Sequence, residues 1–303
     1  MPDATARPDA RPDAHDGVPP GGIGPAAYLG TLLRLPRANA SLVAGLALAG
    51  LILFSCVLGP ALYGRDPFAL HNGFVLSGPA WRFPFGTDDL GRNAFARLLV
   101  AGRSTLSVGL PAAVLAFAVG TLYGLVSGLG PRLLDQALMR LLDAVLALPG
   151  LVVLIFFGAI VPLDTGSLIL LLGLIAWPPL ARLVRNETLA QRERDFVHAS
   201  RQLGGGFIHV AITHLLRVMA PVLVVNFTFL VGDMIFVLSA LSFLGLGVQP
   251  PHTSWGGLLQ DGLDMIALDP WWLIVPPGLM IFAAMLATSL IGQGLLARGS
   301  GRR

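Results

Sequence analysis

The stretch DFVHASRQLGGGFIHVAITH, residues 195–214, interrupts an otherwise apolar chain. Apolar segments long enough to span a bilayer lie on both sides of it, and it carries three histidines and three consecutive glycines. Phe196, Ala199 and Leu203 recur at helical spacing. Gly204 then indicates a helix end, because glycine adopts positive φ without Cβ strain. The stretch therefore predicts a short helix, a glycine turn and a second helix that runs into the next apolar segment.

The composition is that of an integral membrane protein. Of the 303 residues, 54% are hydrophobic and 12% are charged, whereas soluble domains usually hold about 25% charged residues. All 20 basic residues are arginine. The single cysteine, Cys56, lies in an apolar run, which excludes an intramolecular disulfide and favours a structural core residue.

Six apolar segments predict six membrane-spanning helices and an all-α, polytopic fold. The predicted spans are Ser41–Tyr63, Ser104–Leu129, Ala137–Val161, Ser167–Leu183, Leu215–Leu246 and Trp271–Gly292. The fifth is longer than a hydrocarbon layer of about 30 Å requires, so we expect it to tilt, bend or project beyond the membrane. Asn226 and Gly232 are plausible places for a bend.

The arginine distribution predicts the orientation of these spans. Six spans place both termini on one side, and most arginines then lie on or near that side, including the group at 182–217. The positive-inside rule makes this side the cytoplasm. The other side keeps five arginines in one long loop, which obeys the rule weakly: Arg65, Arg82, Arg92, Arg97 and Arg103. The stretch that opens this section is therefore expected to be cytoplasmic.

These assignments divide the chain into four parts. Residues 1–38 are expected to form a disordered cytoplasmic tail, since their proline-, aspartate- and glycine-rich start cannot bury a core. Residues 39–103 hold the first span and an extracytoplasmic loop. Residues 104–292 form a five-helix core with a cytoplasmic loop at 190–217, and residues 293–303 form a cytoplasmic C-terminal tail.

The long outer loop ends in Asp88, Asp89 and Arg92, which precede an amphipathic run. We expect this run to lie along the membrane surface before it enters the second span. A second outer loop, residues 247–270, is followed by two tryptophans that are typical interfacial anchors.

Chemistry-bearing motifs are missing from the sequence. It has no lysine and hence no phosphate-binding loop of the Walker type, no cysteine and histidine set with zinc spacing, and no nucleophile elbow. His209 and His214 are five residues apart, a spacing that does not place two imidazoles on one face of an α-helix. We therefore predict no catalytic residue, no metal site and no cofactor in this chain.

Ionisable residues inside spans are functional candidates, because a charge in hydrocarbon is costly. Asp143 lies three residues from Arg140, which predicts a local ion pair near the interface. Asp233 lies near the middle of the fifth span. It either lines a polar pathway or pairs with an amide or hydroxyl such as that of Asn226.

Four motifs give the chain a resemblance to ABC importer permeases. From about residue 40 to 295 it resembles the dipeptide/oligopeptide/nickel class, and within that class the second permease subunit. The motifs are FPFGTDDLGRNAFARLLVAGRSTLSVGL (83–110), DFVHASRQLGGGFIHVAITHLL (195–216), LSFLGLGVQPPHTSWGGLL (241–259) and DPWWLIVPPGLMIF (269–282).

The resemblance implies a type I ABC importer permease fold in the bacterial inner membrane. It implies a heterodimer with a homologous second permease, two cytoplasmic ATPases that bind ATP and Mg, and an extracytoplasmic solute-binding protein. Membrane lipid surrounds such a subunit, and nucleic acid is no partner. The substrates implied are di- and oligopeptides. The alternatives are nickel chelates or another small solute carried by the same machinery or, in other classes, an ion-coupled secondary transporter or a membrane scaffold.

Site residues also follow from the resemblance. The loop that would dock in an ATPase groove contains Phe196, Ala199, Arg201, Leu203 and Gly204, with Phe196 and Leu203 as its apolar contact. The residues expected to face the binding protein are Asp88, Asp89, Arg92 and Trp255, and those expected to line the pathway are Asn226 and Asp233.

The sequence departs from the family pattern at several positions. His198 and Ser200 stand in the coupling loop where acidic or small residues and alanine are usual. Arg217 replaces a typical proline, and Leu238 replaces an acid before LSFLGLG. These differences leave the implied fold and role intact and weaken any transfer of substrate identity.

Overall fold

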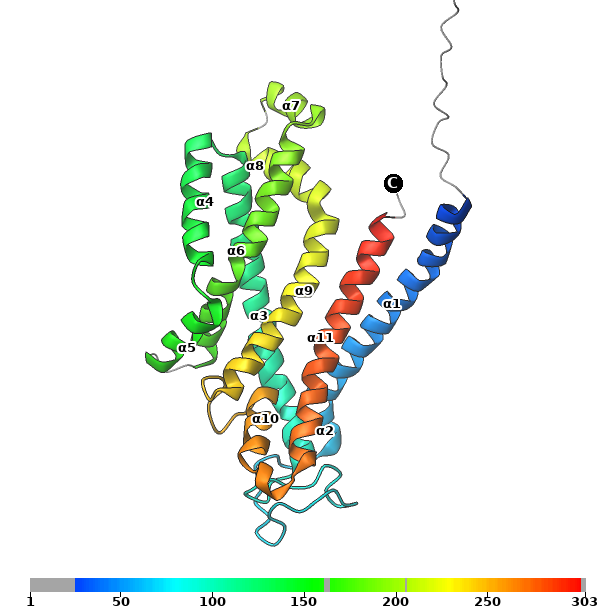
Figure 1. Cartoon of the computed structure of the whole chain (residues 1–303), viewed down its shortest axis with the longest axis vertical. Helices are drawn as coiled ribbons and strands as arrows, with labels where there is room; N and C mark the ends of the chain where they lie inside the picture. The colour runs from blue at the N-terminus through cyan, green and yellow to red at the C-terminus, as the bar shows by residue number, and fades with distance from the viewer. Residues whose placement is uncertain (1–24, 161–163, 205, 301–303) are drawn as a thin grey trace, which may run out of the picture.

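The computed structural model is an elongated bundle of helices (Figure 1). It describes residues 25–160, 164–204 and 206–300, except for the side chains of residues 25–39, 198, 199, 201, 299 and 300. No β-strand occurs within these ranges, where the only extended pairings are isolated bridges in the loop of residues 64–93.

The described elements follow one another with short connections, apart from the loop between the second and third helices. In chain order they are α1 (Pro25–Val57), α2 (Gly59–Tyr63), α3 (Ala94–Leu129), α4 (Arg132–Leu146), α5 (Gly150–Ile160), α6 (Thr165–Arg192), α7 (Asp195–Gln202), α8 (Phe207–His209), the π-helix η1 (Val210–Leu215), α9 (Leu216–Phe243), α10 (Trp255–Asp264), the 3₁₀-helix η2 (Ile266–Leu268) and α11 (Trp271–Ser300).

Five of the helical segments in the described ranges are long and apolar enough to cross a membrane. They are the part of α1 from Ala40, then α3, α6, the continuous segment from α8 to α9, and α11. A sixth span results if the bent pair α4 and α5 counts as one. The prediction of an all-α, polytopic fold is confirmed.

The helices form two close pairs, joined through a shared helix. α3 packs along α6, α1 packs along α11, and α9 contacts both α3 and α11. Figure 1 places α7 at the same end of the bundle as the start of α1 and the end of α11, and places α10 and the loop of residues 64–93 at the other end. We call these the α7 end and the α10 end.

A row of glycines allows α3 and α6 to approach closely. Gly120, Gly124 and Gly128 are spaced four residues apart, so they lie on one face of α3. A Cβ atom added to Gly124 would lie 2.6 Å from the carbonyl oxygen of Ala181 and from Cβ of Val184. Small residues at such intervals let helix backbones pack in a membrane, where dispersion contacts drive association.

The entry into the second span differs from the sequence prediction. Asn93 caps α3, and its Oδ1 accepts hydrogen bonds from the N–H groups of Phe95 and Ala96 at 3.1 and 3.2 Å. From there a single helix runs to Leu129. The expectation of a separate surface segment before Ser104 is therefore wrong, because the cap starts the helix early and no residue before Ser104 ends it.

The third predicted span, 137–161, is broken in the structure. α4 and α5 meet at an angle of 73°. Pro149 lies in the break, where it has no N–H to continue the hydrogen bonds of α4. Its carbonyl oxygen instead accepts from Val152 and Val153 in the first turn of α5.

The ion pair predicted between Arg140 and Asp143 is also wrong. Asp143 pairs with Arg182 of α6, and Asp135 pairs with Arg185 of α6, where Arg185 Nε lies 2.5 Å from Asp135 Oδ1. Arginines on a neighbouring helix thus supply the partners, and they tie α4 to α6.

The fifth span changes its helical pattern before its middle. Residues 210–215 form the π-helix η1, and α9 then continues through both expected bend positions. Asn226 donates from Nδ2 to the carbonyl oxygen of Val222 at 2.8 Å. Gly232 faces α11, where an added Cβ would lie 2.4 Å from Thr288 Oγ1. Gly232 therefore serves helix packing, and the change of helical pattern falls at η1.

Helix extends into both predicted tails. α1 begins at Pro25, so residues 25–38 are helical, and the boundary of the disordered tail at residue 38 is wrong. Proline suits the first turn of a helix, and the alanines and leucines that follow favour helix. α11 likewise continues to Ser300. Residues 1–24 and 301–303 lie outside the described ranges.

Candidate functional site

The short helix α7 lies at one end of the bundle (Figure 1), where the side chain of Val197 anchors it. Val197 is completely buried. It belongs to an apolar cluster with Val184 of α6, Leu215 of η1 and Met219 of α9. A residue on α7 is thereby joined to both long helices on either side of it, so a force applied to α7 is transmitted to them.

Two described apolar side chains, Phe196 in α7 and Leu203 just after it, point outward. Leu203 is 90% exposed and Phe196 is 37% exposed. Together they border an open hollow of about 620 Å³. Its lining is Phe196, Ser200, Leu203, Gly204, Gly206, His209 and His214. Three of the predicted coupling residues thus lie around one surface hollow, while the side chains of Ala199 and Arg201 lie outside those described.

Gly204 ends α7 in the left-handed region. Its φ is +86°, and a Cβ added there would meet no atom within 4 Å. A side chain at this position would therefore be strained by the backbone alone. Gly206 differs, since its φ is −73° and the space around it is also open.

The two histidines after the glycines lie together, contrary to the expectation from their spacing. The ring centroids of His209 and His214 are 5.6 Å apart, and that of Phe196 lies 5.9 Å from His214. The π-helix η1 between the histidines brings residues five apart onto one face. The described residues contain no group of three histidine, cysteine, aspartate or glutamate side chains that could hold a metal ion.

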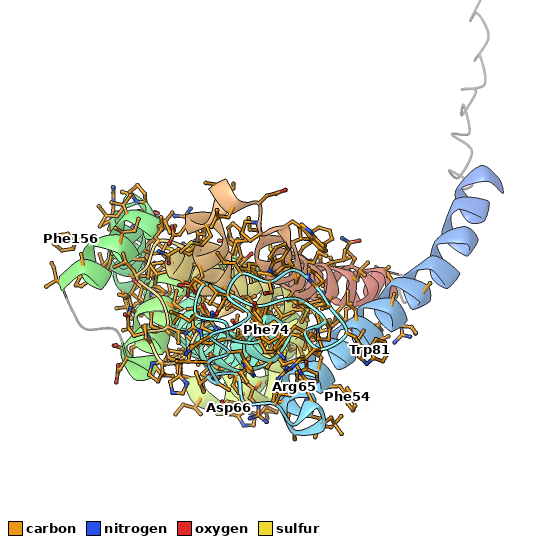
Figure 2. All side chains as sticks on the ribbon, turned by 90° about the horizontal axis from the view of Figure 1, so that it is seen from below. Phe54, Arg65, Asp66, Phe74, Trp81 and Phe156 are labelled. Atoms are coloured by element: carbon orange, nitrogen blue, oxygen red, sulfur yellow. The ribbon has the colours of Figure 1, made fainter. Side chains whose placement is uncertain are left out.

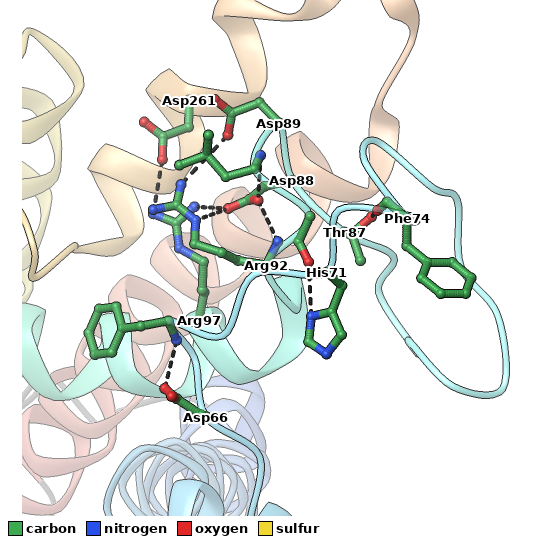
Figure 3. A network of polar contacts seen from close by, with 12 residues as sticks. Asp66, His71, Phe74, Thr87, Asp88, Asp89, Arg92, Arg97 and Asp261 are labelled. Atoms are coloured by element: carbon green, nitrogen blue, oxygen red, sulfur yellow. Dashed lines mark hydrogen bonds and ion pairs between the residues drawn. The ribbon is translucent and has the colours of Figure 1, made fainter.

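At the α10 end, a buried ion-pair network joins the long loop to two helices (Figure 3). Asp88 Oδ2 lies 2.5 Å from Nη1 of Arg97 on α3 and 2.7 Å from Nε of Arg92. Arg97 Nη2 also lies 3.1 Å from Asp261 Oδ2 on α10. Burial raises the pKa of Asp261, and the nearby Arg97 guanidinium partly offsets this effect.

Two residues expected to face a binding protein are buried within this chain, and that expectation is wrong for them. Asp88 is 2% exposed, because its carboxylate is enclosed by the arginines of the network. Trp255 is completely buried: its backbone N–H donates to Thr105 Oγ1 at 3.1 Å, and its Nε1–H donates to the carbonyl oxygen of Leu98 at 3.2 Å. A sequence motif does not show whether its residues are buried. Here Asp88 fixes the loop to α3, and Trp255 fixes α10 to α3.

Asp89 and Arg92 remain at the surface of the α10 end. The side chain of Asp89 is 38% exposed, and that of Arg92 is 19% exposed. Their charged groups are 3.6 Å apart, between Arg92 Nη2 and Asp89 Oδ1. These two candidates are accessible to a partner molecule.

Further surface groups on the same end had no role in the sequence prediction. Trp81 is fully exposed, and Figure 2 shows it on the loop together with Arg65 and Phe74. Arg65 lies over the rings of Tyr63 at the end of α2 and Phe83 of the loop, and Arg82 lies over Phe74. Both arginines line a hollow of about 280 Å³. The sequence shows that Arg65 and Arg82 each lie near aromatic residues along the chain. Only the fold of the loop shows that the two arginines line the same hollow.

The two pathway candidates lie on one face of α9. Asn226 and Asp233 are seven residues apart, close to two helical turns. Asp233 is exposed and Asn226 is half-buried. No hydrogen bond joins their side chains, and the Asn226 amide donates instead to the backbone of its own helix. The predicted alternative of a pair between them is not formed.

Comparison with known proteins gives consistent matches. Residues 120–299 match the family described as binding-protein-dependent transport system inner membrane component. The chain is 37% identical over 259 residues to a putative peptide permease protein of Brucella suis biovar 1, covering 85% of each chain. It is 35% identical over 264 residues to the di/tripeptide transport system permease protein DppC of Pseudomonas aeruginosa, covering 85% of this chain and 86% of that protein. A putative peptide transport system permease protein of Brucella abortus biovar 1 is 34% identical over 273 residues, with 90% and 91% covered.

Proposed function

Because the chain belongs to the family of binding-protein-dependent transport system inner membrane components, we propose that it forms half of a translocation pathway for di- and oligopeptides. It is a permease subunit and not an enzyme, since ATP hydrolysis in this family belongs to a separate subunit. The relatives named above as peptide and di/tripeptide permeases, each similar over at least 85% of this chain, support peptides as the cargo.

The observation that carries the coupling role is the two-sided character of α7. One side is fixed to α6, η1 and α9 through Val197. The opposite side presents Leu203, almost fully exposed, and Phe196 around an open hollow. An apolar side chain that is held rigidly and left uncovered is suited to insert into a groove of a partner protein.

We infer a complete assembly of four kinds of subunit. A homologous second permease would pair with this chain, and two ATPases carrying ATP and Mg would bind the α7 end of the pair. A solute-binding protein would dock at the α10 end, where Asp89, Arg92 and the exposed Trp81 are accessible. In this orientation the α7 end and both chain termini are cytoplasmic.

The physical basis of coupling is rigid-body motion. When the ATPases close on ATP, the groove that holds Leu203 moves, and α7 moves with it. Because Val197 packs against residues of α6 and α9, these helices rock together between inward-open and outward-open arrangements. The chain contributes a stiff contact and a pathway, and the energy enters through that contact.

Replacing Leu203 by aspartate tests this role. We expect the ATPases to be lost from the purified complex, with at least about a tenfold fall in the amount recovered, because a buried anchor at an interface contributes about 2 kcal/mol or more. The measurement is co-purification of the ATPases with the tagged permease, followed by ATP-driven peptide uptake in proteoliposomes.

The matched control is Leu268→Asp. Leu268 is also an exposed leucine, at 63%, but it lies in η2 at the opposite end. It should retain the ATPases. Equal recovery of the ATPases with Leu203→Asp and with the unmodified chain would show that α7 is not the docking element.

The positive φ of Gly204 gives a second test of coupling. Gly204→Val should lower peptide uptake per ATP hydrolysed by about fivefold or more, because forcing a β-branched residue into the left-handed region costs roughly 1–2 kcal/mol and redirects the exit of α7. Gly50→Val is the control, since Gly50 lies in α1 away from the hollow and an added Cβ there meets no atom within 4 Å. Normal coupling in the Gly204 variant, measured as uptake against phosphate release, would contradict the assignment.

A further inference from the structure

Asp233 is a carboxylate at depth in a span. α9 continues for ten residues beyond it to Phe243, about 15 Å at 1.5 Å per residue. On the other side, the segment from Phe207 is longer still. When Phe243 lies at the surface of a hydrocarbon layer about 30 Å thick, Asp233 lies about 15 Å below that surface, near the middle of the layer.

The described residues provide no partner for this carboxylate. No hydrogen bond or ion pair to Asp233 is formed by any residue in the described ranges, and its side chain is exposed on the surface of the single subunit. The arginines of α3 are engaged elsewhere: Arg97 in the network at the α10 end, and Arg103 with the carbonyl oxygen of Val57. A charged group at this depth facing lipid alone would be strongly disfavoured. Because the described residues hold no partner group for Asp233, the geometry favours one on another molecule.

The face around Asp233 offers hydrogen-bond acceptors. Asn226 lies two turns away on the same face, and its Nδ2 is already bonded to Val222. Its side-chain oxygen accepts no hydrogen bond from the described residues. A carboxylate and an amide oxygen about 10 Å apart along the helix axis thus follow one another along the span. One ammonium group cannot reach both oxygens at once, but it can donate N–H bonds first to one and then to the other as it moves along the span.

We propose that Asp233 and Asn226 form a subsite of the translocation pathway that binds the ammonium group of the cargo. The proposal rests on the proposed function, because it places this face of α9 toward the pathway between the two permeases. A fixed cation on the partner permease would bind either the Asp233 carboxylate or the Asn226 side-chain oxygen, and the other oxygen would then have no donor. A moving ammonium group meets both in turn, which fits their spacing along the direction of transport.

The experiment uses the complete transporter in proteoliposomes, with its binding protein saturated by either of two probes. The probes are trialanine and N-acetyl-trialanine, which differ in the ammonium group. We expect the unmodified transporter to move trialanine at least about tenfold faster, because a charge-assisted hydrogen bond is among the strongest single polar contacts. Asp233→Asn should reduce this preference to about twofold or less, and Asp233→Glu should retain most of it.

Thr228→Val is the matched control on the same helix. The Thr228 hydroxyl donates to the carbonyl oxygen of Val225, so its removal should leave the preference between the probes unchanged. Three results would overturn the subsite. They are an unchanged preference in Asp233→Asn, equal slowing of both probes by that substitution, and the absence of any preference in the unmodified transporter. Loss of the second permease from purified Asp233→Asn would overturn it in favour of an ion pair between the permeases. If the unmodified transporter moves neither probe with ATP, the proposed function itself fails, and that result is seen before any variant is made.

Discussion

Replacing Gly124 by valine is expected to prevent the formation of a stable permease. An added Cβ would lie 2.6 Å from the carbonyl oxygen of Ala181 and 2.9 Å from the backbone nitrogen of Arg185. Backbone atoms of α6 cannot rotate away as a flexible side chain can, so α3 and α6 must separate. Separation forfeits the dispersion contacts along the whole pair, and overpacking costs about 3 kcal/mol or more in such a case.

The measurement is the thermal stability of the detergent-purified protein, followed by size-exclusion chromatography after heating. A loss of about 3 kcal/mol corresponds to a fall of roughly 10 °C in Tm for a chain of this size class. Gly278→Val is the control, because a Cβ added to Gly278 of α11 meets nothing within 4 Å. If both variants melt at the same temperature as the unmodified chain, close packing of α3 on α6 does not stabilise the fold.

The sequence predicts the number and type of the helices well because membrane spans have a strong signal. Each span must be long and apolar, and each backbone group must be bonded within its own helix. The residues at which the helices begin and end are harder to predict from the sequence. The cap at Asn93 and the break at Pro149 are visible as residue types in the sequence, but their effect depends on whether neighbouring helices support the turn. The bend at Pro149 was therefore missed inside an apolar run.

The exposed face of α7 and the turn that ends it are predictable because their signal is local. Phe196, Leu203 and Gly204 lie within one short helix and its exit, where periodicity and a glycine are enough to predict the exposed face. His209 and His214 show the limit of that reasoning. Their proximity depends on a π-helix, and the spacing rule of an α-helix does not apply to it.

The prediction that Asp88 and Trp255 are exposed is wrong because their burial depends on tertiary contacts. Asp88 has the features of a surface acid in a polar loop, yet it is enclosed by arginines four and nine residues further along the chain. Trp255 reads as an exposed aromatic, yet its two N–H groups are bonded to α3. Neither contact has a signal in the residues that surround it in the sequence.

The buried network gives the second large effect. Asp88→Asn keeps the size of the side chain, and its remaining oxygen can still accept from the backbone N–H groups of Leu90 and Arg92. It removes the negative charge beside Arg97, which is almost completely buried. Leaving a buried charge without its partner costs about 3–5 kcal/mol. We expect the lower part of this range, because Asp261 still lies 3.1 Å from Arg97.

Two readings check this expectation. The Tm of the purified permease should fall by roughly 10 °C, and the loop of residues 64–93 should become more sensitive to protease, since Asp88 joins that loop to α3. Asp89→Asn is the matched control. Asp89 is more than one-third exposed and its only ion pair has a separation of 3.6 Å among the described residues, so its loss should cost less than about 1 kcal/mol.

The double variant Asp88→Asn with Arg97→Met separates the cost of an unpaired charge from the value of the pair. Removing the arginine takes away the buried charge that the first substitution leaves unsatisfied, so the double variant should be more stable than the sum of the two single changes predicts. Strict additivity would mean that Asp88 and Arg97 act independently, and that the loop is held by its backbone hydrogen bonds alone. The double variant can also recover stability without recovering protease resistance. In that case the charge pair specifies the position of the loop, and the apolar contacts between α3 and α10 determine the stability of that end.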